Sequence, residues 1–227
     1  MLCIFSLSAL AQGEVDNQDK ILFSDEYSIA LGLNTNGFGV GFRYGKYVDY
    51  LHKNLYRIQF CNLRSPKEVR LASSTGLSIY GKSNNVGVLQ GTFGRKSEKF
   101  SKFDKNSVAI YWNYEGGLSL AFEKPTYYHV LYPSGQDIIE KFDDSYYTKY
   151  GKASFSYGIN EIKLVPGLIA MTSAEFNFSN RNTYTTSVEI GASAQTFLRK
   201  VHIMCNADNS WMFITLFVNI RIGKIKE

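Results

Sequence analysis

The chain has 227 residues, a length that suits one domain of the larger all-β kind. Its 16 Tyr, 16 Phe and 19 Gly against only 4 Pro are typical of many strands joined by turns, with aromatic rings at a membrane boundary. The mean hydropathy is −0.18. No apolar run after the N-terminus reaches the roughly 18 residues of a spanning helix, so the sequence excludes a helical membrane protein. The net charge of +5 is spread along the chain and does not indicate nucleic-acid binding.

The N-terminus has the features of an export signal. Its first residues are apolar and end in Ala9-Leu10-Ala11, the small-residue pattern that precedes signal-peptidase cleavage. We therefore predict a signal peptide over 1–11, a short periplasmic segment over 12–26 and a β-barrel over 27–227. The basic residues that usually begin a leader are missing before Glu14, which suggests a true start further upstream. The alternative is a buried N-terminal strand.

The first three predicted strands follow one alternating pattern. Segments 27–34, 37–44 and 55–62 each place bulky apolar side chains on one face and small or polar ones on the other. Asn34 to Gly37 carries a hairpin turn signal, because Asn and Gly tolerate positive φ. Arg43, Arg57 and Cys61 fall on the small or polar face.

The fourth predicted strand, 86–95, is irregular. Val86 and Val88 have the opposite parity to Leu89 and Phe93, which suggests a bulge or a sheltered edge. The fifth, 108–122, is the clearest of all, with Trp112 among the bulky residues of one face and Glu115 among the small residues of the other. We expect its paired region to end near Pro125 and the chain to continue above the membrane through 127–130.

Three further segments complete the pattern: 165–178, 186–197 and 211–223. Glu175, Glu189 and Arg221 lie on their polar faces, although Ile169 and Met171 interrupt the polar face of the first. The polar faces carry few charges, whereas the opposite faces are bulky and apolar. This arrangement is typical of strands with lipid outside and a polar lumen inside. A soluble lipocalin-like barrel is the alternative fold.

We therefore predict an all-β, closed, antiparallel, up-and-down transmembrane β-barrel of about eight strands, or ten if the fifth and sixth segments each hide a turn. With both termini in the periplasm, the connections over 45–54, 96–106 and 179–185 lie on the periplasmic side. Those over 63–85, 133–162 and 200–210 lie outside, together with the first tight turn.

Two groups of residues are candidates for function. Six charged residues are expected to face the lumen, where ion pairs would close a barrel this narrow or gate a polar path; they are Arg43, Arg57, Glu115, Glu175, Glu189 and Arg221. The tyrosines of the long outer loop suit recognition of a protein or glycan, or an aromatic girdle at the lipid headgroups; they are Tyr146, Tyr147, Tyr150 and Tyr157.

Catalysis and metal binding have little support. Of the three histidines, His129 and His202 are predicted on the outer side and His52 in a periplasmic turn, with acidic residues and Ser145 near His129 in sequence. No spacing forms a hydrolase signature or a calcium loop. We expect no catalytic residues, no metal and no cofactor. Cys61 and Cys205 could form a disulfide in an exported chain. Cys61 is expected at an inward strand position and Cys205 in a late loop, which argues against that disulfide.

The leader, the alternating strands, the longer outer loops and the ending F-V-N-I-R-I-G-K resemble small outer-membrane β-barrel proteins of Gram-negative bacteria, of the OmpA-like eight-stranded class. The Gly-rich second strand and the ending are most similar to uncharacterised barrels of Bacteroidota. The chain does not end on an aromatic residue, unlike many proteobacterial barrels.

This resemblance implies an outer-membrane location with outer-membrane lipids, lipopolysaccharide and other envelope proteins as partners. The first functional hypothesis is a non-enzymatic structural barrel or a membrane-embedded subunit of an envelope assembly such as a secretion machine. The alternatives are a small porin-like channel and, third, a lipid-modifying enzyme.

Overall fold

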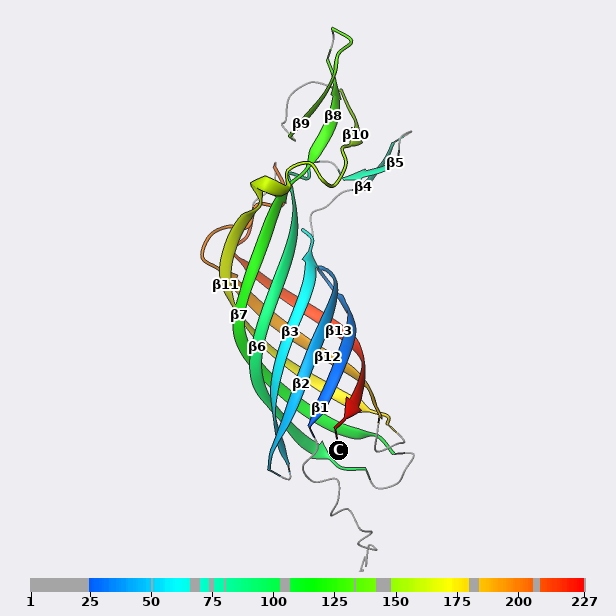
Figure 1. Ribbon diagram of the computed structural model, residues 1–227, viewed down its shortest axis with the longest axis vertical. Coiled ribbons are helices and arrows are strands. Elements are labelled where there is room, and N and C mark those ends of the chain that lie inside the picture. The colour runs from blue at the N-terminus through cyan, green and yellow to red at the C-terminus, as the bar shows by residue number, and fades with distance from the viewer. Residues whose placement is uncertain are drawn as a thin grey trace, which may run out of the picture.

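Eight long antiparallel strands close into a barrel in the order β1, β2, β3, β6, β7, β11, β12 and β13, with β13 pairing back onto β1 (Figure 1). The computed structural model describes residues 25–49, 51–65, 70–73, 76–79, 81–102, 107–132, 134–141, 148–179, 184–205 and 209–226. The barrel strands are β1 (Glu26–Asn34), β2 (Gly37–Asp49), β3 (His52–Leu63), β6 (Asn84–Phe100), β7 (Ala109–Pro125), β11 (Lys163–Asn177), β12 (Tyr184–Phe197) and β13 (Met212–Ile225). The predicted closed barrel is confirmed, with eight strands rather than ten. The predicted signal peptide lies outside the described residues.

Closure leaves no free edge on the barrel. Strand β1 pairs with β13 from Glu26 opposite Ile225 to Asn34 opposite Phe217, and with β2 along the same residues. Because lipid offers no hydrogen-bond partner to the backbone, a sheet can cross a membrane only when every edge is paired in this way. Glu26 belongs to β1, although the sequence placed it in the N-terminal segment.

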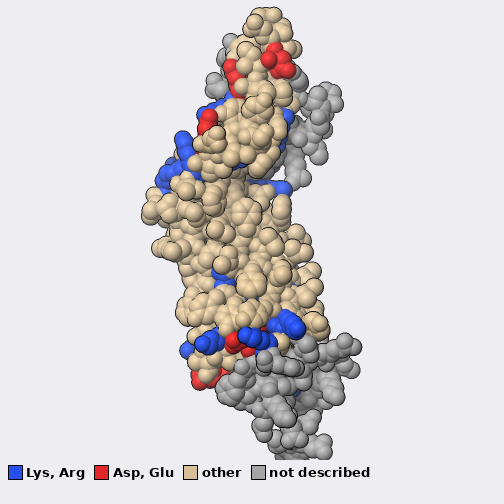
Figure 2. All heavy atoms as spheres, viewed as in Figure 1, with Lys and Arg blue, Asp and Glu red and all other residues tan. Residues whose placement is uncertain are grey.

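The outer surface of the barrel is apolar. Leu31, Leu118 and Ile214 are 68%, 69% and 68% exposed, values that a water-soluble protein would not repeat around its whole circumference. Figure 2 shows a broad band almost free of charged side chains between two charged ends. This band is the lipid-facing surface that the strand parity predicts, and the chain is a membrane-spanning β-barrel. None of the helical segments in the described residues is long and apolar enough to span a membrane.

A row of aromatic rings marks one boundary of the band. The centroids of Tyr27 and Tyr44 are 4.9 Å apart, those of Tyr44 and Tyr56 6.1 Å, and those of Tyr56 and Phe93 5.1 Å. These residues are direct cross-strand partners on β1, β2, β3 and β6. Rings at this level form the girdle that aromatic side chains build at a membrane interface.

The connections divide between the two ends of the barrel in the predicted groups. The turns β2–β3, β6–β7 and β11–β12 lie at the end of the barrel where β1 begins and β13 ends, and the other connections lie at the opposite end (Figure 1). The predicted periplasmic turns 45–54 and 96–106 are too long. Strands β2 and β3 pair as far as Asp49 and His52, and β6 runs to Phe100, because the strands continue as paired polar ladders beyond the lipid.

The outer connections contain more structure than the sequence indicates. Strand β7 ends at Pro125 as expected, and the next residues form β8 (Tyr127–Leu131), the central strand of a small sheet with β9 (Asp137–Lys141) and β10 (Thr148–Lys152). A 3₁₀ turn, η1 (Ile159–Glu161), leads back to the barrel. The connection from β3 to β6 contains a hairpin of β4 (Arg70–Ser73) and β5 (Gly76–Ile79). We call β8, β9 and β10 the outer sheet.

The irregular fourth strand has no bulge over the predicted range. Its register with β3 is continuous from Val86 to Arg95, and its register with β7 shifts only between Glu98 and Phe100. Val86 and Val88 are each 1% exposed because they point inward, while Leu89 and Phe93 point to lipid. The parity therefore holds, and the residues that disturbed the pattern are apolar side chains inside the barrel.

Candidate functional site

The six predicted lumen residues all lie buried inside the barrel. They come from six different strands: Arg43 on β2, Arg57 on β3, Glu115 on β7, Glu175 on β11, Glu189 on β12 and Arg221 on β13. Strand parity alone directs each of them inward, and closure of the sheet then brings them within reach of one another.

These residues form direct ion pairs inside the lumen. Arg43 binds Glu175 through two parallel hydrogen bonds of 2.9 Å. Glu189 accepts at 2.6 Å from Arg57 and at 2.6 Å from Arg221. Arg57 also donates to Glu115. Bidentate and charge-assisted contacts of this kind are the strong form of hydrogen bond, and they offset the cost of burying the charges.

The pairs connect two walls of opposite charge. Arg43 and Arg57 face each other directly on β2 and β3, and Glu175 and Glu189 face each other on β11 and β12. Like charges in these positions repel, so neither pair of facing residues neutralises itself. The pairs Arg43–Glu175 and Arg57–Glu189 connect the two walls across the lumen. Glu115 and Arg221 add further opposite charges beside Arg57 and Glu189.

Sequence analysis missed three members of this network. Lys96 lies 3.0 Å from Glu175, Lys53 lies 3.2 Å from Glu26, and Arg43 lies 3.5 Å from Glu26. The sequence places Lys96 in a periplasmic turn because the fourth strand is expected to end at Arg95. It places Glu26 in the N-terminal segment because the first strand is expected to begin at Tyr27. The parity of Gln90 and Thr92, continued along β6, would have placed Lys96 in the lumen.

Neutral polar groups add hydrogen bonds to the network. Thr92 donates to Glu115 at 2.6 Å, Ser173 to Glu189 at 2.6 Å and Ser187 to Glu175 at 2.8 Å. Asn113 and Asn219 donate at 3.2 Å to Glu175 and Glu189. Glu26, Glu115, Glu175 and Glu189 are therefore each held by contacts from several strands.

The outer half of the lumen is filled by apolar side chains. The connection from β12 to β13 folds into the barrel mouth, where Val201, Ile203 and Met204 are 0%, 2% and 8% exposed. They pack in a cluster with Leu63, Val86, Val88, Ala121, Val165, Phe197 and Phe213. Ile169 and Met171, the apolar residues on the inner face of β11, pack nearby with Phe217. We call the first cluster the mouth plug.

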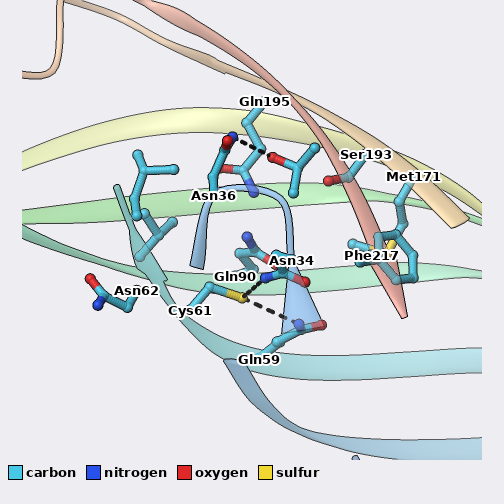
Figure 3. Close-up of a pocket in the computed structure, with 13 residues that line it drawn as sticks. Asn34, Asn36, Gln59, Cys61, Asn62, Gln90, Met171, Ser193, Gln195 and Phe217 are labelled. Carbon is cyan, nitrogen blue, oxygen red and sulfur yellow. Dashed lines mark hydrogen bonds between the residues drawn. The ribbon is translucent and has the colours of Figure 1, made fainter. Parts of the chain in front are cut away.

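A small cavity lies near this plug. It has a volume of about 20 Å³, room for a single water molecule. Figure 3 shows its polar lining, in which Cys61 Sγ accepts hydrogen bonds from Asn34 at 3.6 Å and Gln59 at 3.2 Å. Cys61 is buried and Cys205 exposed, and both thiols are free, so the two cysteines do not pair.

The outer-loop tyrosines are only partly described. Tyr146 and Tyr147 lie outside the described residues, and Tyr150 lies in β10. Tyr157 is 47% exposed, with its ring centroid 6.2 Å from that of Tyr127 on β8. The structure therefore leaves the recognition role of this group a prediction.

The histidines lie outside the lumen. His129 Nδ1 is 3.5 Å from Asp137 on the outer sheet, and His202 Nδ1 is 3.4 Å from Asn209. His52, predicted in a turn, is the first residue of β3, and its Nδ1 is 3.9 Å from Asp49 at the end of β2. Within the described ranges, no group of three or more His, Cys, Asp or Glu residues could hold a metal ion.

Comparison with known proteins gives similarity to solved outer-membrane barrels at low identity. No protein-family model matches the chain, and no curated protein matches it. Neisserial surface protein A is 9% identical with a TM-score of 0.41, over 90% of this chain and 96% of that one. Ail of Yersinia pestis, in complex with the heparin analogue sucrose octasulfate, is 8% identical with a TM-score of 0.40, over 89% of this chain and 97% of that one. The N-terminal β-barrel domain of Pseudomonas aeruginosa OprF is 10% identical with a TM-score of 0.38, over 89% of this chain and 96% of that one.

The architecture and the paired lumen define the class: a closed, eight-stranded, antiparallel transmembrane barrel, the architecture of the small OmpA-like barrels. No residue role is transferred at these identities. The similarity to barrels of Bacteroidota in particular stays a prediction.

Proposed function

We propose that the protein is a non-enzymatic barrel of the bacterial outer membrane that does not conduct, and that acts as a structural protein or a membrane-embedded subunit of an envelope assembly. The observation that carries this proposal is the filled lumen. Ion pairs occupy its periplasmic half, the mouth plug occupies its outer half, and the cavity near the plug holds about one water molecule.

The outer-membrane location is supported by the barrel itself. The closed sheet, the apolar band and the aromatic row suit a bilayer, and the longer connections all lie at the end opposite the termini. In outer-membrane barrels this end faces the outside. The outer sheet then stands beyond the membrane surface, where a partner could reach it.

A partner-binding role is favoured by exposed apolar residues near the outer sheet. Leu131 and Ile138 are 43% and 41% exposed, and Phe155, in the segment that follows, is 72% exposed. Leu131 and Ile138 lie in the outer sheet, beyond Pro125, so the lipid that covers Leu118 does not explain their exposure. The Phe155 ring packs on Lys124 at the barrel rim, with the ring centroid 4.2 Å from Nζ. Tyr157 extends this surface and suits contact with a protein or glycan.

The porin-like alternative has weaker support. The inward charges that suggested it are engaged with one another, and a conducting path would also have to pass the mouth plug. The lipid-modifying alternative rests on His129 or His202 as a base. Asp137 could orient His129 and Asn209 could orient His202, but neither contact supplies a nucleophile.

Two measurements test the proposal. In a planar lipid bilayer, we expect the purified full-length protein to give no ion-conducting steps. Regular steps of fixed size would overturn the closed lumen and favour the porin-like function. In parallel, a tagged protein extracted from native outer membranes should bring a stoichiometric envelope protein with it. The same protein lacking residues 127–152 should not.

A further inference from the structure

A charged groove opens at the outer rim of the barrel, apart from the lumen. Its volume is about 820 Å³, within the range of small-molecule sites. One side is formed by the ends of the barrel strands, with Glu123 and Arg199, and the other by the outer sheet and η1, with Lys141 and Glu161. Figure 2 shows Lys and Arg side chains gathered where the outer sheet meets the barrel.

A buried carboxylate fixes one cation of this groove. Glu123 is 2% exposed and accepts from Arg199 at 2.7 Å and 3.2 Å, and from the backbone N–H of His202 at 2.8 Å. The Arg199 side chain nevertheless remains 41% exposed. A buried acid thus holds a guanidinium in one orientation at the groove wall, which lowers the entropy cost of using it to bind a ligand.

The opposite side carries two lysines around one acid. Lys141 forms an ion pair with Glu161, whose Oε1 also accepts from Tyr127 at 2.9 Å. Lys163, at the start of β11, lines the same groove. The lining therefore includes Arg199, Lys141 and Lys163 against Glu123 and Glu161, and both acids already have a cationic partner. The excess charge is positive and favours an anion.

The groove also borders the lipid band. Leu164 lines it, is 55% exposed and follows Lys163 directly on β11. A ligand at this position meets cations on its polar side and lipid-facing leucine on its apolar side. An amphiphile with an anionic headgroup satisfies both.

We propose that this groove binds the phosphate monoester of a glycolipid in the outer leaflet, with Arg199 and Lys163 as its ligands and Glu123 as the positioning residue for Arg199. Arg and Lys are the side chains that phosphate recognition favours, and basic residues beside a membrane attract phosphorylated headgroups. The inference rests on the outer-membrane location proposed above, but not on the closed lumen.

The test is lipid binding by the full-length protein in detergent micelles, measured by native mass spectrometry. The probes are lipid A with its phosphates, the same lipid without them, and inorganic phosphate. We expect the R199Q/K163Q variant to bind phosphorylated lipid A at least tenfold more weakly than the original protein. The original protein should show a similar loss with the dephosphorylated lipid.

The control variant is K46Q/K224Q, which removes the same charge from exposed positions near the periplasmic end. It should bind within twofold of the original protein, and all variants should show the same heat-dependent gel mobility of a folded barrel. Equal binding by R199Q/K163Q, or equal binding of the dephosphorylated lipid, would overturn the proposal. Inorganic phosphate binding as tightly as the lipid would overturn the glycolipid assignment.

E123Q gives an independent check on positioning. It keeps Arg199 and Lys163 but removes the carboxylate charge that orients the guanidinium. We expect weaker binding of phosphorylated lipid A despite the more positive groove. Tighter binding would mean that bulk charge, not an oriented arginine, governs the site.

Discussion

Single residues of the lumen are held by contacts from several strands at once. Glu189 on β12 accepts hydrogen bonds from Arg57 on β3, Ser173 on β11 and Arg221 on β13. Replacing such a residue lowers the free energy of unfolding by an amount that depends on which charges remain buried beside it. A neutral side chain at this position would leave arginine charges without their counter-charge.

We expect E189Q to lower the free energy of unfolding by about 3–5 kcal/mol, because Arg221 loses its carboxylate partner and Arg57 keeps only Glu115. The measurement is urea-induced unfolding in lipid vesicles. D49N, which neutralises an acid whose side chain is 68% exposed, serves as the control and should change stability by less than about 0.5 kcal/mol. An E189Q variant as stable as D49N would show that the pairs contribute nothing.

Two glycines on β6 give a matched test of packing. A Cβ at Gly94 would lie 1.9 Å from the Tyr114 carbonyl oxygen and 2.7 Å from Glu115 Cγ. A Cβ at Gly91 would meet nothing within 4 Å. We expect G94A to destabilise the barrel by about 1–3 kcal/mol through overpacking, while G91A has no measurable effect. Equal stabilities in the same unfolding assay would contradict the close approach of β6 and β7.

At the scale of elements, the outer sheet is built separately from the barrel. β8 pairs with β9 and β10, and none of the three pairs with a barrel strand. Its links to the barrel rim are individual contacts, such as the Tyr128 hydroxyl donating to the Lys82 carbonyl at 3.2 Å. The ion pair of Lys141 with Glu161 connects β9 to η1 in the same way.

This connection should depend on pH. The hydrogen bond from Lys141, followed by that from Tyr127, lowers the pKa of Glu161 below its ordinary value of 4.5. A depressed carboxyl pKa gives stability that is present above the ordinary value and lost as the pH falls through the lowered one. We expect NMR titration of the Glu161 carboxyl carbon to give a midpoint below 4.5. In K141Q this midpoint should move upward; an unchanged midpoint would exclude Lys141 as the cause.

Removal of the outer sheet should leave the barrel intact. In the test variant, a short Gly-Ser linker replaces residues 127–152. We expect its thermal midpoint to stay within about 5 °C of the original, because the deletion removes no hydrogen bonds between barrel strands. Circular dichroism in detergent gives the midpoint. A large fall would mean that the rim contacts of Tyr128 and Lys141 support the barrel itself.

At the scale of the whole molecule, closure is what makes the lumen stable. The arginines of β2 and β3 and the glutamates of β11 and β12 are like-charged neighbours within each wall. An open sheet with the same strands would keep both repulsions and gain none of the cross-lumen pairs. The ion pairs therefore favour the closed state specifically, in addition to the backbone ladders that closure completes.

The sequence by itself determined the class of fold and the direction of most side chains. Period-two alternation is a local property of an extended chain, so Arg43 and Glu175 could be assigned to the lumen from their own neighbours alone. The same local pattern failed where inward residues are apolar, as at Val86 and Val88, or where a strand extends beyond the lipid, as at Lys96.

Only the tertiary structure decided which lumen charges pair and what fills the mouth. Pairing of Arg43 with Glu175 spans 132 positions of sequence and depends on the register of every strand between them. The mouth plug likewise depends on Val201, Ile203 and Met204 in the connection after β12, whose inward position no strand pattern specifies. The outer sheet and the charged groove at the rim could not be predicted from the sequence for the same reason. Short strands and grooves arise from contacts between distant segments.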